Sequence, residues 1–266
     1  MRERTLAFFA IQAGAQVILE TGDDNAPLDG FWSSRQQNIS CSMVTEAGWV
    51  NAYRYFTEAL IWPRGLPLDA LKLPPPSRDS VAAMVKACSV QQGLANGDPD
   101  VDAIYRLVLP LPFEFREAEP LGLGRGSWCP FNSQNTTFFP EAYPLLYVPY
   151  HCSFRMTDIW RSFVALAIMH VNDWGLMFHG ETVFQDRNEH SLMRDFADEV
   201  SGYLNNRRIA EELSTLKLLA GEAEIASNMR LCYQRLIELE LVGSAELDLL
   251  DAWFSDLIQV RSAAQG

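Results

Sequence analysis

The hydrophobic pattern at the start of the chain predicts a helix followed by a strand. Residues 5–13 are mostly apolar and rich in helix formers, and Gly14 stands where such a helix would stop. The run Ala15-Gln16-Val17-Ile18-Leu19 then predicts a buried, central strand of an α/β sheet, because a short apolar run bounded by turn residues is typical of one. A helix that leads into a strand is half of a βαβ unit, and we expect the strand before it to be absent.

Further sheet segments are expected in the middle of the chain. Residues 81–91 predict a strand or a short helix, and residues 175–178 predict a short strand. Residues 101–108 alternate between two faces, which predicts a strand with Asp102 and Arg106 on the same face. The glycine-rich residues 122–126 lack the strand and helix that flank a phosphate-binding loop, so they predict a flexible connection.

The second half of the chain predicts helices. A long apolar helix is expected from about residue 157 to residue 171. Two apolar stripes follow at helical spacing, comprising Ile225, Met229, Cys232, Leu236 and Leu239, and then Leu247, Leu250, Phe254 and Leu257. Core packing or an interface between copies of the chain explains both stripes. We therefore expect a domain over residues 1–205 and a helical C-terminal extension over residues 206–266.

Composition narrows the class of protein. The 266 residues are 48% hydrophobic and 21% charged, which is typical of a globular protein with a substantial core. The formal net charge of −13 argues against nucleic-acid binding, which rewards clustered cations. The five cysteines are widely spaced and predict buried free thiols. No apolar run spans a bilayer and no signal peptide is evident, so a soluble, cytoplasmic protein without a transmembrane segment is expected.

An acidic stretch follows the first predicted strand. Glu20-Thr21-Gly22-Asp23-Asp24-Asn25 stands where that strand ends, and ligands bind in the crevice beyond the carboxyl ends of strands in open α/β sheets. Carboxylate oxygens suit Mg²⁺ or Mn²⁺, which can in turn hold a diphosphate. The alternative is a polar turn, because Asp-Asp-Asn before Ala-Pro is good loop chemistry by itself.

Polar side chains crowd three later segments. Asn132, Gln134 and Asn135 lie among aromatic residues that include Trp128, so they match either sugar hydroxyls and rings or a hydrogen-bonded loop. Asp158 begins the long helix, where it suits either an N-terminal cap or an ionised base or ligand.

The third of these segments is residues 183–190. In it His190 is a candidate metal ligand and Arg187 a candidate phosphate binder, although a lone histidine is more often a loop residue.

Six of these segments occur in an order that resembles a known family, the STELLO-like glycosyltransferases. The matching motifs are Glu20-Thr21-Gly22-Asp23-Asp24-Asn25, Trp62-Pro63-Arg64-Gly65, residues 99–107, residues 130–136, residues 155–161 and residues 185–190. A weaker resemblance, in the acidic stretch and in Asp158-Ile159-Trp160, is to the reversibly glycosylated polypeptides, which are nucleotide-sugar mutases.

The resemblance implies a GT-A-like α/β fold, in which a mixed sheet is flanked by helices, together with a nucleotide-sugar substrate and a divalent cation. In that family the acidic motif reads Glu-Thr-Asp-Asp-Asp-Asn, so Gly22 removes one carboxylate of the usual pair. The strands that precede the motif in a GT-A fold are also expected to be absent here.

The leading hypothesis is therefore a metal-dependent glycosyltransferase. Asp23 and Asp24, with His190, would hold Mn²⁺ or Mg²⁺, and Arg187 would stabilise the leaving diphosphate. Asp158 would be the base or would stabilise the transition state, and Arg161 would orient it. The residues expected to contact the sugar or an unknown glycan or protein acceptor are Asp102, Trp128, Asn132, Gln134, Asn135 and Trp160.

Two alternatives use the same residues differently. A non-catalytic glycosyltransferase-like scaffold would bind partners or copies of itself through residues 222–258. A metal-dependent phosphohydrolase would use the same carboxylates and His190 without a sugar acceptor. Relatives in plants are Golgi-associated, which implies that compartment if this chain is part of a longer family member.

Overall fold

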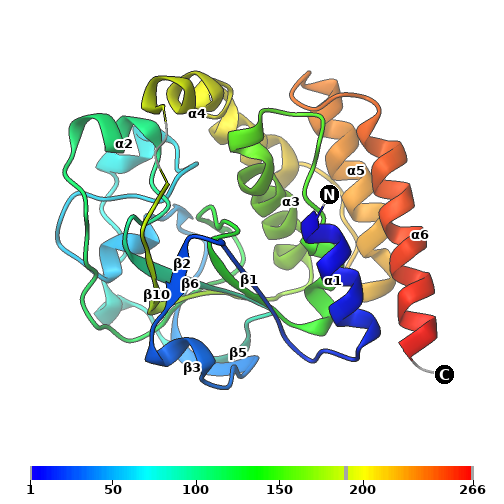
Figure 1. Ribbon diagram of the computed structural model, residues 1–266, viewed down its shortest axis with the longest axis horizontal. Coiled ribbons are helices and arrows are strands. Elements are labelled where there is room, and N and C mark those ends of the chain that lie inside the picture. The colour runs from blue at the N-terminus through cyan, green and yellow to red at the C-terminus, as the bar shows by residue number, and fades with distance from the viewer. Residues whose placement is uncertain (1, 189–190, 265–266) are drawn as a thin grey trace.

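The computed structural model describes residues 2–188 and 191–264, and it shows a mixed β-sheet flanked by helices (Figure 1). The expected α/β class, with C-terminal helices and consistent with a GT-A-like fold, is confirmed. In Figure 1 the helices α1, α3, α5 and α6 gather on one side of the molecule, and α2 and α4 lie at its top edge. No helix in the described part of the chain is long and apolar enough to cross a bilayer.

The sheet of the described residues has eight strands, in the order β1-β9-β6-β10-β7-β3-β5, with β2 paired to β10. The pairs β6–β10 and β3–β7 are parallel, and the other pairs are antiparallel. The strands are β1 (Ile18–Thr21), β2 (Asn25–Pro27), β3 (Asn38–Val44), β5 (Ala83–Ala87), β6 (Val90–Gly97), β7 (Leu121–Leu123), β9 (Asn135–Phe138) and β10 (Leu176–Gln185). A separate parallel pair joins β4 (Gly48–Trp49) to β8 (Ser127–Trp128).

Six α-helices lie in the described residues. They are α1 (Arg2–Gln12), α2 (Ala103–Val108), α3 (Thr157–Val171), α4 (Leu192–Ser214), α5 (Ile225–Glu238) and α6 (Glu246–Ala264). Helix α3 is the centre of the core, because every residue from Ile159 to Met169 is buried. It packs against α4 and α5, and α6 packs against α1 and α5.

The N-terminal helix is confirmed, and Gly14 follows it with φ of 77°, a left-handed conformation that glycine adopts without steric cost. The strand after it differs from the prediction. β1 lies at the edge of the sheet, pairs with β9, and is only half buried. An apolar run predicts that a strand is shielded from water, but it does not predict whether the strand pairs with one neighbouring strand or with two.

The predicted strand over residues 101–108 is wrong, because this segment forms helix α2. The Asp102 carboxylate caps the helix by accepting a hydrogen bond from the Tyr105 backbone N–H at 2.8 Å. A cap of this kind stabilises a helix start by about 1 kcal/mol, which is enough to override a short alternating pattern.

Residues 81–91 contribute two strands, β5 and the start of β6, and the short strand expected at residues 175–178 extends to Gln185 as β10. The flexible connection expected at residues 122–126 is wrong at its start, because Gly122 lies inside β7. A Cβ atom there would collide with Met43 and Cys41, so this glycine allows close packing of β7 on β3.

The apolar stripe of α5 packs into the core. Ile225, Met229, Cys232 and Leu236 are at most 1% exposed and join the hydrophobic cluster that surrounds α3. Helix α4 crosses the predicted boundary at residue 205, so one core serves both sides of it. The prediction of free thiols is confirmed for all five cysteines, of which only Cys152 is not fully buried.

Candidate functional site

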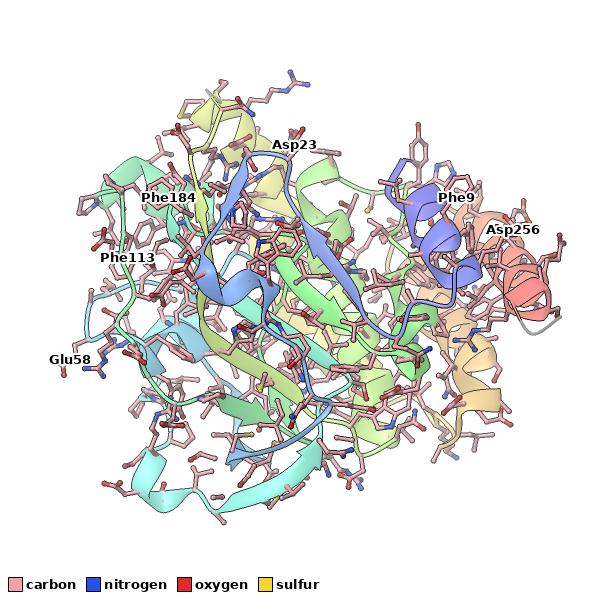
Figure 2. The ribbon with its side chains drawn as sticks, turned by 60° about the horizontal axis from the view of Figure 1, so that its bottom comes forward. Phe9, Asp23, Glu58, Phe113, Phe184 and Asp256 are labelled. Atoms are coloured by element: carbon pink, nitrogen blue, oxygen red, sulfur yellow. The ribbon has the colours of Figure 1, made fainter. Side chains whose placement is uncertain are left out.

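The polar residues singled out above lie mostly at one end of the sheet. The turn between β1 and β2, the end of β10, and the starts of α2, α3 and α4 meet there. Figure 2 shows Asp23 at the tip of that turn, far from Phe9 and Asp256 on the helical side and from Glu58 at the opposite edge.

The acidic turn presents oxygen atoms from three consecutive residues. Asp23 is exposed, and Asp24 is half buried with one carboxylate oxygen accepting a hydrogen bond from Gln185 Nε2 at 2.8 Å. The Asn25 amide donates to the Thr21 hydroxyl at 2.9 Å and to the Gln134 carbonyl at 2.6 Å, and this leaves its own Oδ1 atom buried without a partner. The turn is therefore held by its neighbours while its oxygen atoms remain available.

These oxygen atoms fit a hard divalent cation that is also held by a substrate. Mg²⁺ commonly binds to one or two carboxylates, keeps several waters, and takes its remaining ligands from phosphate oxygens. Among the described residues no group of three or more His, Cys, Asp or Glu side chains gathers closely enough to enclose a metal alone. His190, the third expected ligand, lies outside the described residues.

Gly22 stands beside this pair of carboxylates. A Cβ atom at this position would lie 2.7 Å from Asp24 Oδ1, the end of a flexible side chain. An aspartate here would therefore displace the Asp24 carboxylate slightly but would not strain the backbone.

A buried network of ion pairs lies behind the turn. Arg64 contacts Asp100 twice, at 2.8 Å each, and contacts Asp158 at 2.8 and 3.1 Å. Burial alone would lower the pKa of this guanidinium, but the two carboxylates raise the pKa well above its ordinary value. Arg64 stays charged and fixes the loop that carries it to the start of α3.

The Asp158 carboxylate binds to this ion-pair network and does not cap the helix. The helix cap lies at Met156, so of the two roles that the sequence leaves open for Asp158 the N-terminal cap is not observed, although the residue lies in the first turn of α3. One carboxylate oxygen accepts from Arg64 and from the Ser133 backbone N–H at 3.3 Å, and the side chain is 13% exposed. Both of its oxygen atoms already have partners from the protein.

Arg161 lies one turn further along α3 and is 1% exposed. It forms an ion pair with Glu20 at 2.8 Å, donates to the Ser133 hydroxyl at 3.2 Å, and lies over the rings of Phe131 and Phe138. Its link to Asp158 therefore runs through Ser133, and its ion pair is with the residue before the acidic turn.

The three carboxamides hold the loops of the site together. Asn132 accepts from the Gln134 backbone N–H at 2.9 Å, and Asn135 donates to the Leu94 carbonyl and to the Thr182 hydroxyl at 3.0 and 2.8 Å. Gln134 accepts from the Asp100 backbone N–H at 3.1 Å and donates to Gln185. The structure shows these groups in the hydrogen-bonded arrangement, and contact with a sugar stays a prediction.

Two other expected contact residues are closed to ligands in this conformation. Trp160 is 1% exposed and donates its indole N–H to Asn206 at 3.0 Å. Asp102 is also 1% exposed and accepts from the Trp62 indole at 2.6 Å. Burial raises the pKa of Asp102 to about 6, although hydrogen bonds from Trp62 and Tyr105 oppose the shift.

Arg187 differs from the other arginines of the site because it is only loosely paired. It lies two residues beyond Gln185, the hydrogen-bond partner of Asp24, and within the described residues it forms one long ion pair, with Asp195 at 3.7 Å. Its side chain is 10% exposed, and its Nε atom has no hydrogen-bond partner in the described chain. The position suits an anion held between Arg187 and the acidic turn.

The pKa of Arg187 reflects the same environment. Burial, and then the nearby Arg106 and Arg155, lower the pKa to about 10, while Asp100 opposes them. The guanidinium is still charged at neutral pH. A second negative group beside it would relieve both the desolvation and the repulsion between cations.

Sequence reasoning missed the partners of this network. The sequence places Arg64 only within the motif Trp62-Pro63-Arg64-Gly65, and it singles out neither Asp100 nor the pair of Arg155 with the fully buried Glu199. The available signal was that charged residues stand inside otherwise apolar or proline-rich motifs, because such residues are rarely buried without a partner.

Comparison with known proteins confirms the resemblance to the STELLO-like family. The model of the STELLO glycosyltransferases matches residues 155–263. "Probable glycosyltransferase STELLO2" of Arabidopsis thaliana is 27% identical over 279 residues, which cover 95% of this chain and 35% of that protein. "Probable glycosyltransferase STELLO1" of the same plant is 29% identical over 174 residues, which cover 58% of this chain and 23% of that protein. The chain thus spans about a third of the length of the first relative.

Proposed function

We propose that this chain, which is similar to the STELLO glycosyltransferases, carries the donor site of a glycosyltransferase that uses a nucleoside diphosphate sugar and Mn²⁺ or Mg²⁺. The observation that supports this best is the position of Arg187. Arg187 is a buried, loosely paired cation in the segment whose preceding residues, Gln185 and Asp186, donate hydrogen bonds to Asp24 of the acidic turn.

The acidic turn is the proposed cation site. Asp23 and Asp24, with the unpartnered Oδ1 of Asn25, supply the hard oxygen atoms that such cations prefer. A bound cation would neutralise charge on the leaving diphosphate. The Gln185 hydrogen bond orients Asp24 for this purpose, and Gly22 leaves its second oxygen unobstructed.

Arg187 is the proposed diphosphate ligand. A guanidinium donates two parallel hydrogen bonds to phosphate oxygens, and the energy of each is larger where water is scarce. The neighbouring Arg64, Arg106 and Arg155 are each paired with carboxylates, so Arg187 is the arginine that supplies the direct contact.

Asp158 and Arg161 act as positioning residues in this proposal. Asp158 fixes Arg64, and Arg161 fixes Glu20 at the base of the acidic turn. The acceptor remains a glycan or a protein, and the carboxamides of residues 132–135 shape the loop that would face the sugar.

The test measures release of nucleoside diphosphate from a panel of UDP- and GDP-sugars with Mn²⁺, with Mg²⁺ or with chelator. We expect cation-dependent release that Asp24→Asn lowers by at least about 100-fold, a loss typical when charge stabilisation is removed. Glu58→Gln is the matched control, because its carboxylate is 89% exposed at the far edge of the molecule (Figure 2). The proposal fails if no nucleotide sugar is turned over and none shifts the melting temperature in the presence of either cation.

The non-catalytic scaffold is the second candidate, and the occupied carboxylate of Asp158 favours it. It predicts that Asp24→Asn changes neither turnover nor a cation-dependent thermal shift. A partner would have to use the outward residues of α5 and α6, such as Leu231 and Ile258, because the stripe on α5 is buried in the core. Release of inorganic phosphate without a sugar acceptor would instead indicate the phosphohydrolase.

A further inference from the structure

A second site lies at the other end of α3. A cavity of about 660 Å³ opens between the β4–β8 pair and the C-terminal ends of α3 and α4. Its volume is typical of a small-molecule site. Since α3 has 15 residues, its two ends are about 22 Å apart, so this cavity is separate from the acidic turn.

Two tryptophans, Trp49 and Trp128, line the cavity on the side of the β4–β8 pair. The parallel register of β4 and β8 places Trp49 opposite Trp128, with ring centroids 6.2 Å apart. Phe163 of α3 packs edge-on against both, and His170 meets Trp128 at 5.0 Å with an interplanar angle of 88°. Trp128 is buried, whereas Trp49 is partly exposed and presents indole surface to the opening.

The rim carries a glutamate in an unusual conformation. Glu46 has φ of 51°, and its backbone N–H donates to the Arg125 carbonyl at 2.8 Å. A non-glycine residue in this left-handed region costs about 1–2 kcal/mol, so glycine would stabilise the turn better. The Glu46 carboxylate lies against Gly126, where any Cβ atom would collide with it. The turn is therefore strained in this conformation, and the Glu46 carboxylate lies at the rim of the cavity.

Four charged side chains line the cavity, namely Glu46, Arg125, Arg207 and Glu211. Within the described residues Glu46, Arg125 and Glu211 lack an ion-pair partner and Arg207 pairs with Asp69 at 2.8 Å, so the lining has a slight excess of negative charge. Burial lowers the pKa of His170 to about 4, so the imidazole is neutral at pH 7. Its Nε2 atom lies 3.2 Å from the Ser127 carbonyl and must carry the proton there, which leaves Nδ1 as an acceptor.

We propose that this cavity binds one neutral pyranose sugar. The tryptophan rings pack against the apolar face of a sugar ring, and the rim supplies both acceptors, on Glu46 and His170, and a donor, on Arg125. An alkyl ligand would leave those polar groups without partners, which is costly once water is excluded. An anionic ligand would meet the unpaired carboxylates of Glu46 and Glu211. The inference rests on this cavity alone and does not depend on the proposed transferase function.

The test titrates the full chain with the methyl glycosides of glucose, galactose, mannose and xylose. Saturation-transfer NMR and tryptophan fluorescence report binding. We expect at least one probe to saturate, Glu46→Gln to weaken it at least 10-fold, and Trp49→Phe to weaken it several-fold. Glu58→Gln and Trp32→Phe are the matched controls, since Trp32 is 78% exposed and lies outside the cavity lining, and both should bind like the unchanged chain.

Two results would overturn the proposal. One is the absence of saturable binding for all four glycosides in a folded chain. The other is binding that survives both cavity substitutions, or that Asp24→Asn removes, since either pattern would place the sugar elsewhere. Glu46 is exposed, so Glu46→Gln gives a folded protein on which these outcomes can be measured.

Discussion

The polar groups at the two ends of α3 are arranged differently. At its N-terminal end, buried arginines and carboxylates neutralise one another, and Arg187 is the one among the described arginines there with a loose partner. At its C-terminal end, tryptophan rings line one side of an open cavity, and the charges stand on an exposed rim. The first arrangement suits a highly charged ligand, and the second suits a neutral one. Five substitutions test whether the N-terminal end of α3 binds a charged ligand and the C-terminal end a neutral one.

The largest effect is expected at Arg64. Arg64→Ala would leave Asp100 and Asp158 as buried, unpaired carboxylates, and the free energy of unfolding should fall by about 3–5 kcal/mol. Urea denaturation measures this. The control Arg116→Ala removes a surface pair whose side chains are 56% and 89% exposed, and it should cost less than about 1 kcal/mol. Equal losses in the two variants would refute the buried network.

Arg187→Met should separate ligand binding from stability. Because its pair with the buried Asp195 is long, at 3.7 Å, replacement by an apolar side chain of similar length should lower the unfolding free energy by less than Arg64→Ala does. Affinity for a nucleoside diphosphate with Mn²⁺ should nevertheless fall at least about 30-fold, which is roughly 2 kcal/mol. Calorimetry measures the affinity. A variant that loses stability and keeps its affinity would show that Arg187 is structural.

The two ends should also respond oppositely to acid. Asp102, near the N-terminal end, has a pKa raised to about 6, so the folded chain binds its proton before the unfolded chain does. As the pH falls from 6 toward 4, this carboxyl adds stability, up to about 3 kcal/mol, and the addition is lost as the pH rises again. Asp102→Asn should remove this contribution from a plot of unfolding free energy against pH. An unchanged plot would contradict the raised pKa.

His170, at the C-terminal end, has the opposite sign. Its pKa is lowered to about 4, so between pH 6.5 and 4 the imidazole binds a proton in the unfolded chain but not in the folded chain. Stability from this group is therefore complete above pH 6.5 and is lost as the pH falls, by up to about 3 kcal/mol. His170→Gln should flatten this decline. If acid destabilised the variant as steeply as the unchanged chain, the imidazole would not be buried as described.

The smallest effect is expected at Glu46. Glu46→Gly removes the cost of a left-handed glutamate and should raise the unfolding free energy by about 1 kcal/mol, while sugar binding at the cavity is lost. Thermal unfolding and the glycoside titration are measured on the same sample. A destabilised variant would mean that the carboxylate holds the turn together and is not kept there for a ligand.

The sequence predicts best what is repeated and local. Helical spacing predicts α5 and α6, and long apolar runs predict the first helix and α3, because many residues contribute to each pattern. Sequence pattern fails over residues 101–108, where a helix capped by Asp102 forms in place of the strand that the alternation predicts. It also misjudged β1, because an apolar run does not distinguish an edge strand from a central one.

The candidate site was predictable only in part. Residue type alone identifies the acidic stretch and Arg187 as candidates, and the structure binds Gln185, two residues before Arg187, to Asp24 of that stretch. The role of Arg64 was not, since its two carboxylate partners lie 36 and 94 residues away in the chain and no local pattern connects them. Burial of Trp160 was likewise invisible, because an aromatic residue in a motif looks the same whether it faces a ligand or the core.

The acidic turn connects two strands that have different partners in the sheet. Its two arms belong to different strands, since β1 is hydrogen-bonded to β9 and β2 to β10. As an edge strand, β1 can leave the sheet by breaking one ladder, whereas β10 is bonded on both sides. The amide protons of β1 should therefore exchange with solvent well before those of β10. Entry and exit of whatever binds at this turn would then proceed by fraying of one strand, with the rest of the sheet intact.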